Sequence, residues 1–187
     1  MQYPSIFIYT NKVNAFENHE VIHVMDFSIV YSQKINDNVI IKESESCFIF
    51  AHVNIAFRKE LVHLDDYNKL IQTDFSLFVD KFTWGFLVVI NKVTKELQII
   101  NDPYGIYPLY YFQSKENIIT ISNDFHSLIN HQNNLHLDYN GVYDYFLFNY
   151  TLKSRTLIRE IKQFEGGTKF SYLNREFNIH SYINILE

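Results

Sequence analysis

The chain has 187 residues, the length of one ordinary domain, with 47% hydrophobic and 20% charged residues. Its formal net charge of −5 argues against binding to a nucleic-acid backbone, which requires clustered Lys and Arg. Apolar runs are shorter than the ~20 residues of a membrane-spanning helix, so we expect a single cytoplasmic domain over residues 1–187 without membrane or nucleic-acid partners.

Cysteine and histidine usage argues against a metal site. Cys47 is the single cysteine, which excludes an internal disulfide and a site with several thiolate ligands. The eight histidines show no HExxH or paired Cys/His spacing. We therefore expect neither a bound metal nor a cofactor.

The first half of the chain predicts strands followed by helix. The apolar character of Cys47–Ala56 is nearly continuous, which favours a strand covered on both faces. Apolar residues between Leu64 and Phe82 lie near helical spacing, with Asp74 as a cap before Phe75. The other predicted strands are Ser5–Thr10, Val21–Ser32 and Val39–Lys42, separated by turns at Asn11–Asn14 and at 36–38.

The second half predicts hairpins and two helices, Asp124–Asn130 and Asp138–Asn149. Strands, internal helices and further strands joined by tight turns are typical of the α+β class with mainly antiparallel sheets. The predicted strand pairs are Trp84–Asn91 with Glu96–Asn101, Ile106–Gln113 with Asn117–Ser122, and Thr168–Leu173 with Glu176–Ile183, the last opened by Gly166 and Gly167.

The segment Asn101–Tyr111 reads Asn-Asp-Pro-Tyr-Gly-Ile-Tyr-Pro-Leu-Tyr-Tyr and predicts a β-turn. In this turn Asp102 bonds its own backbone, Gly105 supplies a positive φ, and Pro108 fixes the chain before a strand. We interpret these three residues as structural.

This segment resembles a signature of the N-terminal glutamine amidotransferase domain of asparagine synthetases. Trp84–Ile90 before it and Ser122–Ile129 after it are similar to further family landmarks, in the same order. The resemblance extends from about residue 82 to residue 183, and over residues 1–81 it rests on strand order. The residues that match the signature are Asp102, Gly105, Ile106, Pro108, Leu109, Tyr110 and Tyr111.

The resemblance implies the four-layer αββα sandwich of N-terminal-nucleophile hydrolases and an amidotransferase of class II. These enzymes attack glutamine with an N-terminal cysteine, exposed when the initiator methionine is removed. Gln2 stands in the position of that cysteine, so we expect a degenerate domain without catalytic residues. Cleavage before Cys47 would leave too little chain for the fold.

Isolated polar residues are weaker indications of a functional site. His52 and Asp102 are an alternative acid–base pair, although a histidine in an apolar strand is more often a core residue. Asp65 and Asp66 are typical of a helix start, and Arg58 of a protein surface.

We therefore expect a catalytically inactive domain of an asparagine-synthetase-like system. It would support, or recognise substrate for, an ATP-dependent amide-forming synthetase. The resemblance implies the same role as that of the N-terminal domains of β-lactam synthetases and lasso-peptide cyclases, which have lost the cysteine. Two alternatives remain open: an active hydrolase that uses another nucleophile, such as Ser5 or Cys47, and a small-molecule binding module that uses the vestigial glutamine pocket. Self-association is also left open.

Overall fold

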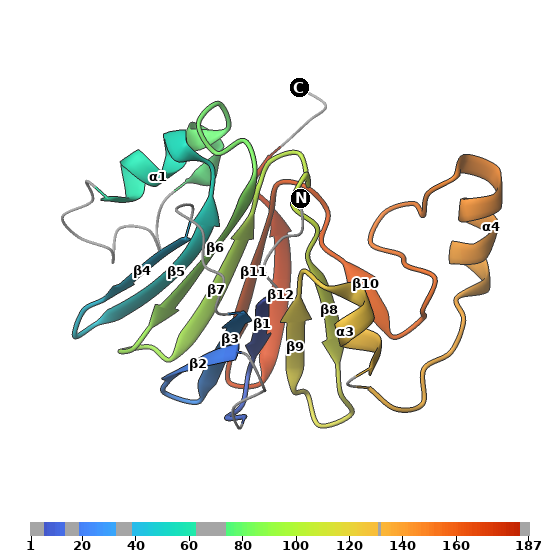
Figure 1. The fold of residues 1–187 in the computed structure, drawn as a ribbon, viewed down its shortest axis with the longest axis horizontal. Helices are drawn as coiled ribbons and strands as arrows, with labels where there is room; N and C mark the ends of the chain where they lie inside the picture. The colour runs from blue at the N-terminus through green and yellow to red at the C-terminus, as the bar shows by residue number, and fades with distance from the viewer. Residues whose placement is uncertain (1–5, 14–18, 33–38, 63–73, 131, 184–187) are drawn as a thin grey trace. The chain divides into compact units, whose positions relative to one another are not determined.

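The computed structural model contains two compact units, each built from two separate segments of the chain. The first unit consists of residues 1–33 and 108–165, and the second of residues 34–107 and 166–187. Each holds one six-stranded antiparallel sheet (Figure 1). The predicted α+β class with mainly antiparallel sheets is confirmed, whereas the single domain over 1–187 stays a prediction. The structure describes residues 6–13, 19–32, 39–62, 74–130 and 132–183.

The sheet of the first unit has the order β10-β8-β9-β1-β3-β2. Strand β1 lies inside it, with Ile8 opposite both Ile29 of β3 and Ile121 of β9. All three isoleucines are buried, so the first described strand forms part of the unit's core. The strands are β1 (Ile6–Tyr9), β2 (His19–Val24), β3 (Phe27–Ser32), β8 (Tyr110–Gln113), β9 (Ile119–Ser122) and β10 (Ile161–Gln163).

Two strand predictions in this unit were wrong in extent, and one strand was not predicted. Val21–Ser32 is a hairpin, because the chain turns at Met25 with a φ of 58°. Strand β8 begins at Tyr110 and not at Ile106, because the preceding residues belong to the turn described below. Strand β10 has three residues and no sequence pattern of its own.

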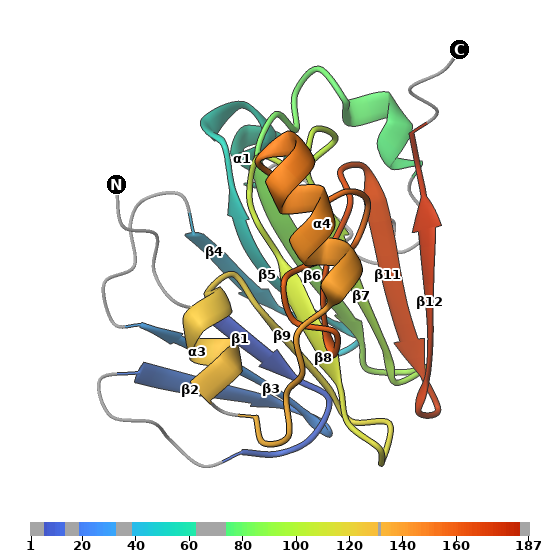
Figure 2. The same cartoon turned by 90° about the vertical axis from the view of Figure 1, so that its right-hand side faces the viewer.

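Two helices in the first unit confirm the predicted ones. Helix α3 (Phe125–Asn130) packs against β9 (Figure 2). The Asp124 side chain accepts a hydrogen bond from the Ser127 N–H at 3.2 Å. Helix α4 (Tyr139–Phe148) starts at Asp138, whose side chain accepts bonds from two backbone N–H groups. It ends at Asn149, which adopts the left-handed conformation typical of a C-cap. Figure 1 shows α4 beyond the β10 edge of the sheet.

The sheet of the second unit has the order β12-β11-β7-β6-β5-β4. All seven residues of β5 are buried, as its continuous apolar pattern predicted. The strands are β4 (Val39–Glu43), β5 (Cys47–Val53), β6 (Gly85–Asn91), β7 (Glu96–Asn101), β11 (Thr168–Leu173) and β12 (Glu176–Ser181).

The prediction that β5 continues to Ala56 was wrong, because helix α1 (Ile55–Val62) begins there. The Asn54 side chain donates to the Lys81 carbonyl at 2.7 Å and accepts from the Thr83 N–H at 3.2 Å. These bonds turn the chain away from the sheet. The Asn54 carbonyl then accepts the first helical bond, from Arg58.

One face of this sheet is covered by α1 and by the 3₁₀ helix η1 (Phe75–Phe78). Phe57 of α1 stacks on Phe82 with ring centroids 4.5 Å apart. Asp74 caps η1 as predicted, because its side chain accepts from the Ser76 N–H. Residues 14, 36–38 and 64–73 of the predicted turns and helix lie outside the described residues.

Within the described ranges, none of the helices combines the length and the apolar character that crossing a bilayer requires.

Candidate functional site

The turn after β7 is organised around the Asp102 carboxylate, which is 0% exposed. One oxygen accepts hydrogen bonds from the N–H groups of Tyr104 at 3.1 Å and Ile106 at 2.9 Å. The other accepts from Gly85 at 3.2 Å and Tyr107 at 2.9 Å. A buried carboxylate is costly unless it is fully hydrogen-bonded. Four backbone donors therefore hold residues 102–107 in one conformation.

The Asp102 backbone extends the same turn to the C-terminal hairpin of the second unit. Its carbonyl accepts from Gly105 at 3.2 Å and from Gly167 at 2.8 Å. Gly105 has a φ of +63°, a conformation that glycine adopts without strain. A Cβ on Gly166 would lie 2.7 Å from the Pro103 carbonyl oxygen, so the close approach of the two segments requires glycine there as well.

Pro108 is the first residue of the second segment of the other unit. It precedes Leu109, whose carbonyl accepts from the Phe164 N–H at 2.9 Å. The chain is therefore anchored immediately after Pro108 as well as before it, at Tyr107.

An enclosed aromatic cluster surrounds His52 of β5, which is 0% exposed. Its Nδ1 lies 3.0 Å from the Tyr107 hydroxyl, and its Nε2 is buried without a hydrogen-bond partner among the described residues. Trp84 meets His52 edge-on at 5.2 Å and stacks on Tyr107 at 6.1 Å. Burial lowers the pKa of His52 to about 4, so the ring is neutral near pH 7.

The suggested pairing of His52 with Asp102 is indirect in the structure. Asp102 binds the backbone N–H of Tyr107, and His52 meets the hydroxyl of the same residue. No direct His52–Asp102 bond occurs among the described contacts. Among the described residues, the neutral His52 therefore has no carboxylate with which it shares a proton.

A family model described as a glutamine amidotransferase domain matches residues 77–183, more than half of the chain. The matched region contains the Asp102 turn and every element from β6 to β12. The chain belongs to the glutamine amidotransferase domain family. Among curated proteins, no sequence matches it significantly.

The single cysteine of the chain is buried. Cys47 lies outside the matched region, at the start of β5, and is 1% exposed. Its Sγ faces the Phe48 carbonyl at 3.8 Å, inside the second unit's core. The thiol is therefore closed to substrate.

The remaining candidates form no site in the described structure. Arg58, predicted at the surface, is half-buried on α1, and its Nε is buried without a hydrogen-bond partner among those residues. Ser5, Asp65 and Asp66 lie outside the described residues. Where side chains are described, no group of three or more His, Cys, Asp and Glu is arranged to hold a metal ion.

Sequence reasoning missed a pocket of about 300 Å³ in the first unit. It lies among β8, β10, α3 and the C-terminal end of α4. Its walls come from short segments far apart in the chain, so no sequence motif marks it. The lining residues are Tyr110, Phe125, Tyr145, Asn149, Tyr150, Thr151, Thr156, Leu157 and Gln163.

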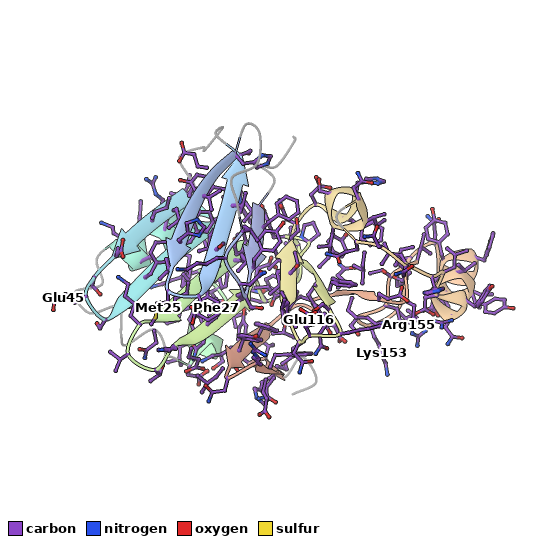
Figure 3. The ribbon with its side chains drawn as sticks, turned by 90° about the horizontal axis from the view of Figure 1, so that it is seen from below. Met25, Phe27, Glu45, Glu116, Lys153 and Arg155 are labelled. Carbon is purple, nitrogen blue, oxygen red and sulfur yellow. The ribbon has the colours of Figure 1, made fainter. Side chains whose placement is uncertain are left out.

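The exposed surface of α4 is apolar. Phe146 is 81% exposed and Leu147 is 74% exposed, with Tyr139 and Tyr143 also exposed. The one charged residue of the helix, Asp144, is buried and accepts a bond from Arg155 at 2.7 Å. Figure 3 shows Arg155 reaching toward α4. A contiguous apolar surface of this kind is typical of a protein-binding site.

Asp102→Asn should lower the free energy of unfolding by about 3 kcal/mol, because an amide NH₂ replaces one acceptor oxygen and faces two backbone N–H groups. Chemical denaturation measures the loss. Asp74→Asn is the matched control, since asparagine caps a helix as well as aspartate does. Equal losses in the two variants would contradict a special role for Asp102.

The stability of the protein should fall as the pH drops from about 6.5 to about 4, because unfolded His52 binds a proton that folded His52 does not. The shift from the ordinary value of 6.5 to about 4 corresponds to about 3 kcal/mol. Denaturation of the wild type and of His52→Gln at about pH 7 and about pH 4.5 measures this part of the pH dependence. The same pH dependence of stability in both proteins would contradict this role of His52.

Proposed function

We propose that this chain is a class II, asparagine-synthetase-like amidotransferase domain that does not hydrolyse glutamine and instead binds an ATP-dependent, amide-forming synthetase. The observation that carries the proposal is the burial of Cys47, the single cysteine of the chain. Amidotransferases release ammonia through a cysteine thioester. A thiol inside the core of a sheet cannot form it with glutamine.

Cleavage before Cys47 does not restore the chemistry. It would remove β1 to β4, and β1 is paired with both β3 and β9 inside the first unit's sheet. The three remaining strands of that sheet would lose the partner that carries Ile8. Cleavage that creates an N-terminal cysteine would thus disrupt the sheet of the first unit.

The exposed apolar surface of α4 supports a binding role. Phe146 and Leu147 are large side chains that project from a helix whose only charge is paired internally. Aromatic and aliphatic residues in such a position anchor protein interfaces. A synthetase is the partner that family resemblance favours, because related N-terminal domains without the cysteine occur beside amide-forming domains.

The purified chain should release no ammonia from glutamine above the level of buffer. The physical reason is that Cys47 is inaccessible, so Cys47→Ala should behave as the wild type does. A coupled ammonia assay, with an active amidotransferase as positive control, makes the measurement. Ammonia release that disappears in Cys47→Ala would overturn the proposal, because it would show the buried thiol to be the nucleophile.

The double variant Phe146→Ser, Leu147→Ser should bind a synthetase-like protein encoded beside this chain at least about tenfold more weakly than the wild type. Calorimetry measures the affinity, and thermal unfolding should be unchanged because both side chains are exposed. Leu77→Ser is the matched control, since Leu77 is 78% exposed on the second unit. No association of the wild type, or equal weakening by Leu77→Ser, would count against the proposed role of α4.

A further inference from the structure

The pocket of the first unit has aromatic walls. Tyr110 and Phe125 form one wall, with ring centroids 5.1 Å apart and planes tilted by 54°. Tyr145 and Tyr150 approach from the C-terminal end of α4. Rings at several angles can stack on a flat ligand and also meet its edge.

The wall beyond α4 is preformed by internal hydrogen bonds. The Thr156 hydroxyl donates to the carbonyls of Ile158 and Ile161 at 2.8 Å, and Thr151 donates to the Arg155 carbonyl at 2.8 Å. Asp144 accepts from the Leu152 N–H at 3.1 Å. The residues between α4 and β10 are therefore held in place before any ligand arrives.

Two carboxamides supply polar groups on the lining. Asn149 is the C-cap of α4, and Gln163 is the last residue of β10, with its backbone N–H bonded to the Ser154 carbonyl at 2.9 Å. Among the described hydrogen bonds, neither side-chain amide is used. Each carboxamide offers both donors and an acceptor, so the two together match a ligand group that also donates and accepts.

None of the described residues that line the pocket carries a charged side chain. Asp144 of α4 and Arg155 of the following segment form an ion pair with each other at 2.7 Å. Burial raises the pKa of the Tyr110 phenol above its ordinary value of 10.0, so this group stays a neutral donor near pH 7. A charged ligand would lose its hydration here without gaining a counter-charge.

We propose that this pocket binds an uncharged aromatic ring that carries a primary amide or an equivalent donor–acceptor edge. The ring would lie between the aromatic walls, and the amide would pair with Asn149 and Gln163. A volume of about 300 Å³ is at the lower end of small-molecule pockets, which suits one small ring compound. The site requires no cysteine chemistry and is independent of the proposed synthetase partner.

Titration of the full chain with benzamide, followed by amide NMR, tests the proposal. The expected result is saturable shifts at the backbone of the pocket residues, with a dissociation constant of about 1 mM or below. Benzoate and benzylamine, which have the same ring and opposite charges, should bind at least about tenfold more weakly.

Two variants locate the binding site. Gln163→Leu removes a carboxamide with little change in size, and Leu157→Trp fills the pocket, so each should weaken benzamide binding at least about tenfold. Gln113→Leu on the neighbouring strand β8 is the matched control and should bind as the wild type does. Unchanged spectra of first-unit residues outside the pocket, in β1 and β3, verify folding of each variant.

Absence of saturation by about 10 mM benzamide, equal binding of benzoate, or full binding by Leu157→Trp would overturn the proposal. Neither glutamine nor a synthetase takes part in this experiment. A negative result with benzamide would therefore not contradict the proposed function. Conversely, ammonia release or a lack of synthetase binding would not contradict the proposed ligand of the pocket.

Discussion

The second unit depends on the burial of one negative charge. Asp102 is 0% exposed and has only backbone N–H groups as described partners for its carboxylate. Because unsatisfied buried charges are strongly destabilising, this demand selects one conformation for residues 102–107. Tyr107 is thereby placed so that its hydroxyl meets His52. The hydrogen bonds to Asp102 thus determine both the conformation of the turn and the position of Tyr107 in the aromatic cluster.

The same turn joins strands that are distant in sequence. The Asn101 side chain accepts hydrogen bonds from the Thr168 N–H at 2.8 Å and from its hydroxyl at 3.2 Å, and the Tyr182 hydroxyl donates to the Asn101 carbonyl. Burial, followed by the charge of Asp102, raises the pKa of Tyr182 above its ordinary value. This turn, which lies in the region matched by the glutamine amidotransferase family model, therefore fixes the C-terminal hairpin.

Features governed by near neighbours in sequence could be predicted, and features governed by distant ones could not. Asp74 and Asp138 bind N–H groups within three residues, so their capping roles are readable from sequence. The start of α1 depends on Asn54 bonds to residues almost thirty positions away. Strand β10 exists because β8 pairs with it across about fifty residues. The aromatic pocket could not be predicted from the sequence for the same reason, since its walls meet only after α4 and β10 are in place.

The place of β1 inside its sheet has a consequence for biosynthesis. Phe7 pairs with Val30 on one side and with Ser122 on the other. During synthesis, until β9 (Ile119–Ser122) has been made, the β9 side of β1 is therefore an open strand edge beside buried residues, which is a template for aggregation. This edge closes only when β9, more than a hundred residues further along the chain, pairs with β1, and the closure of so long a loop is slow.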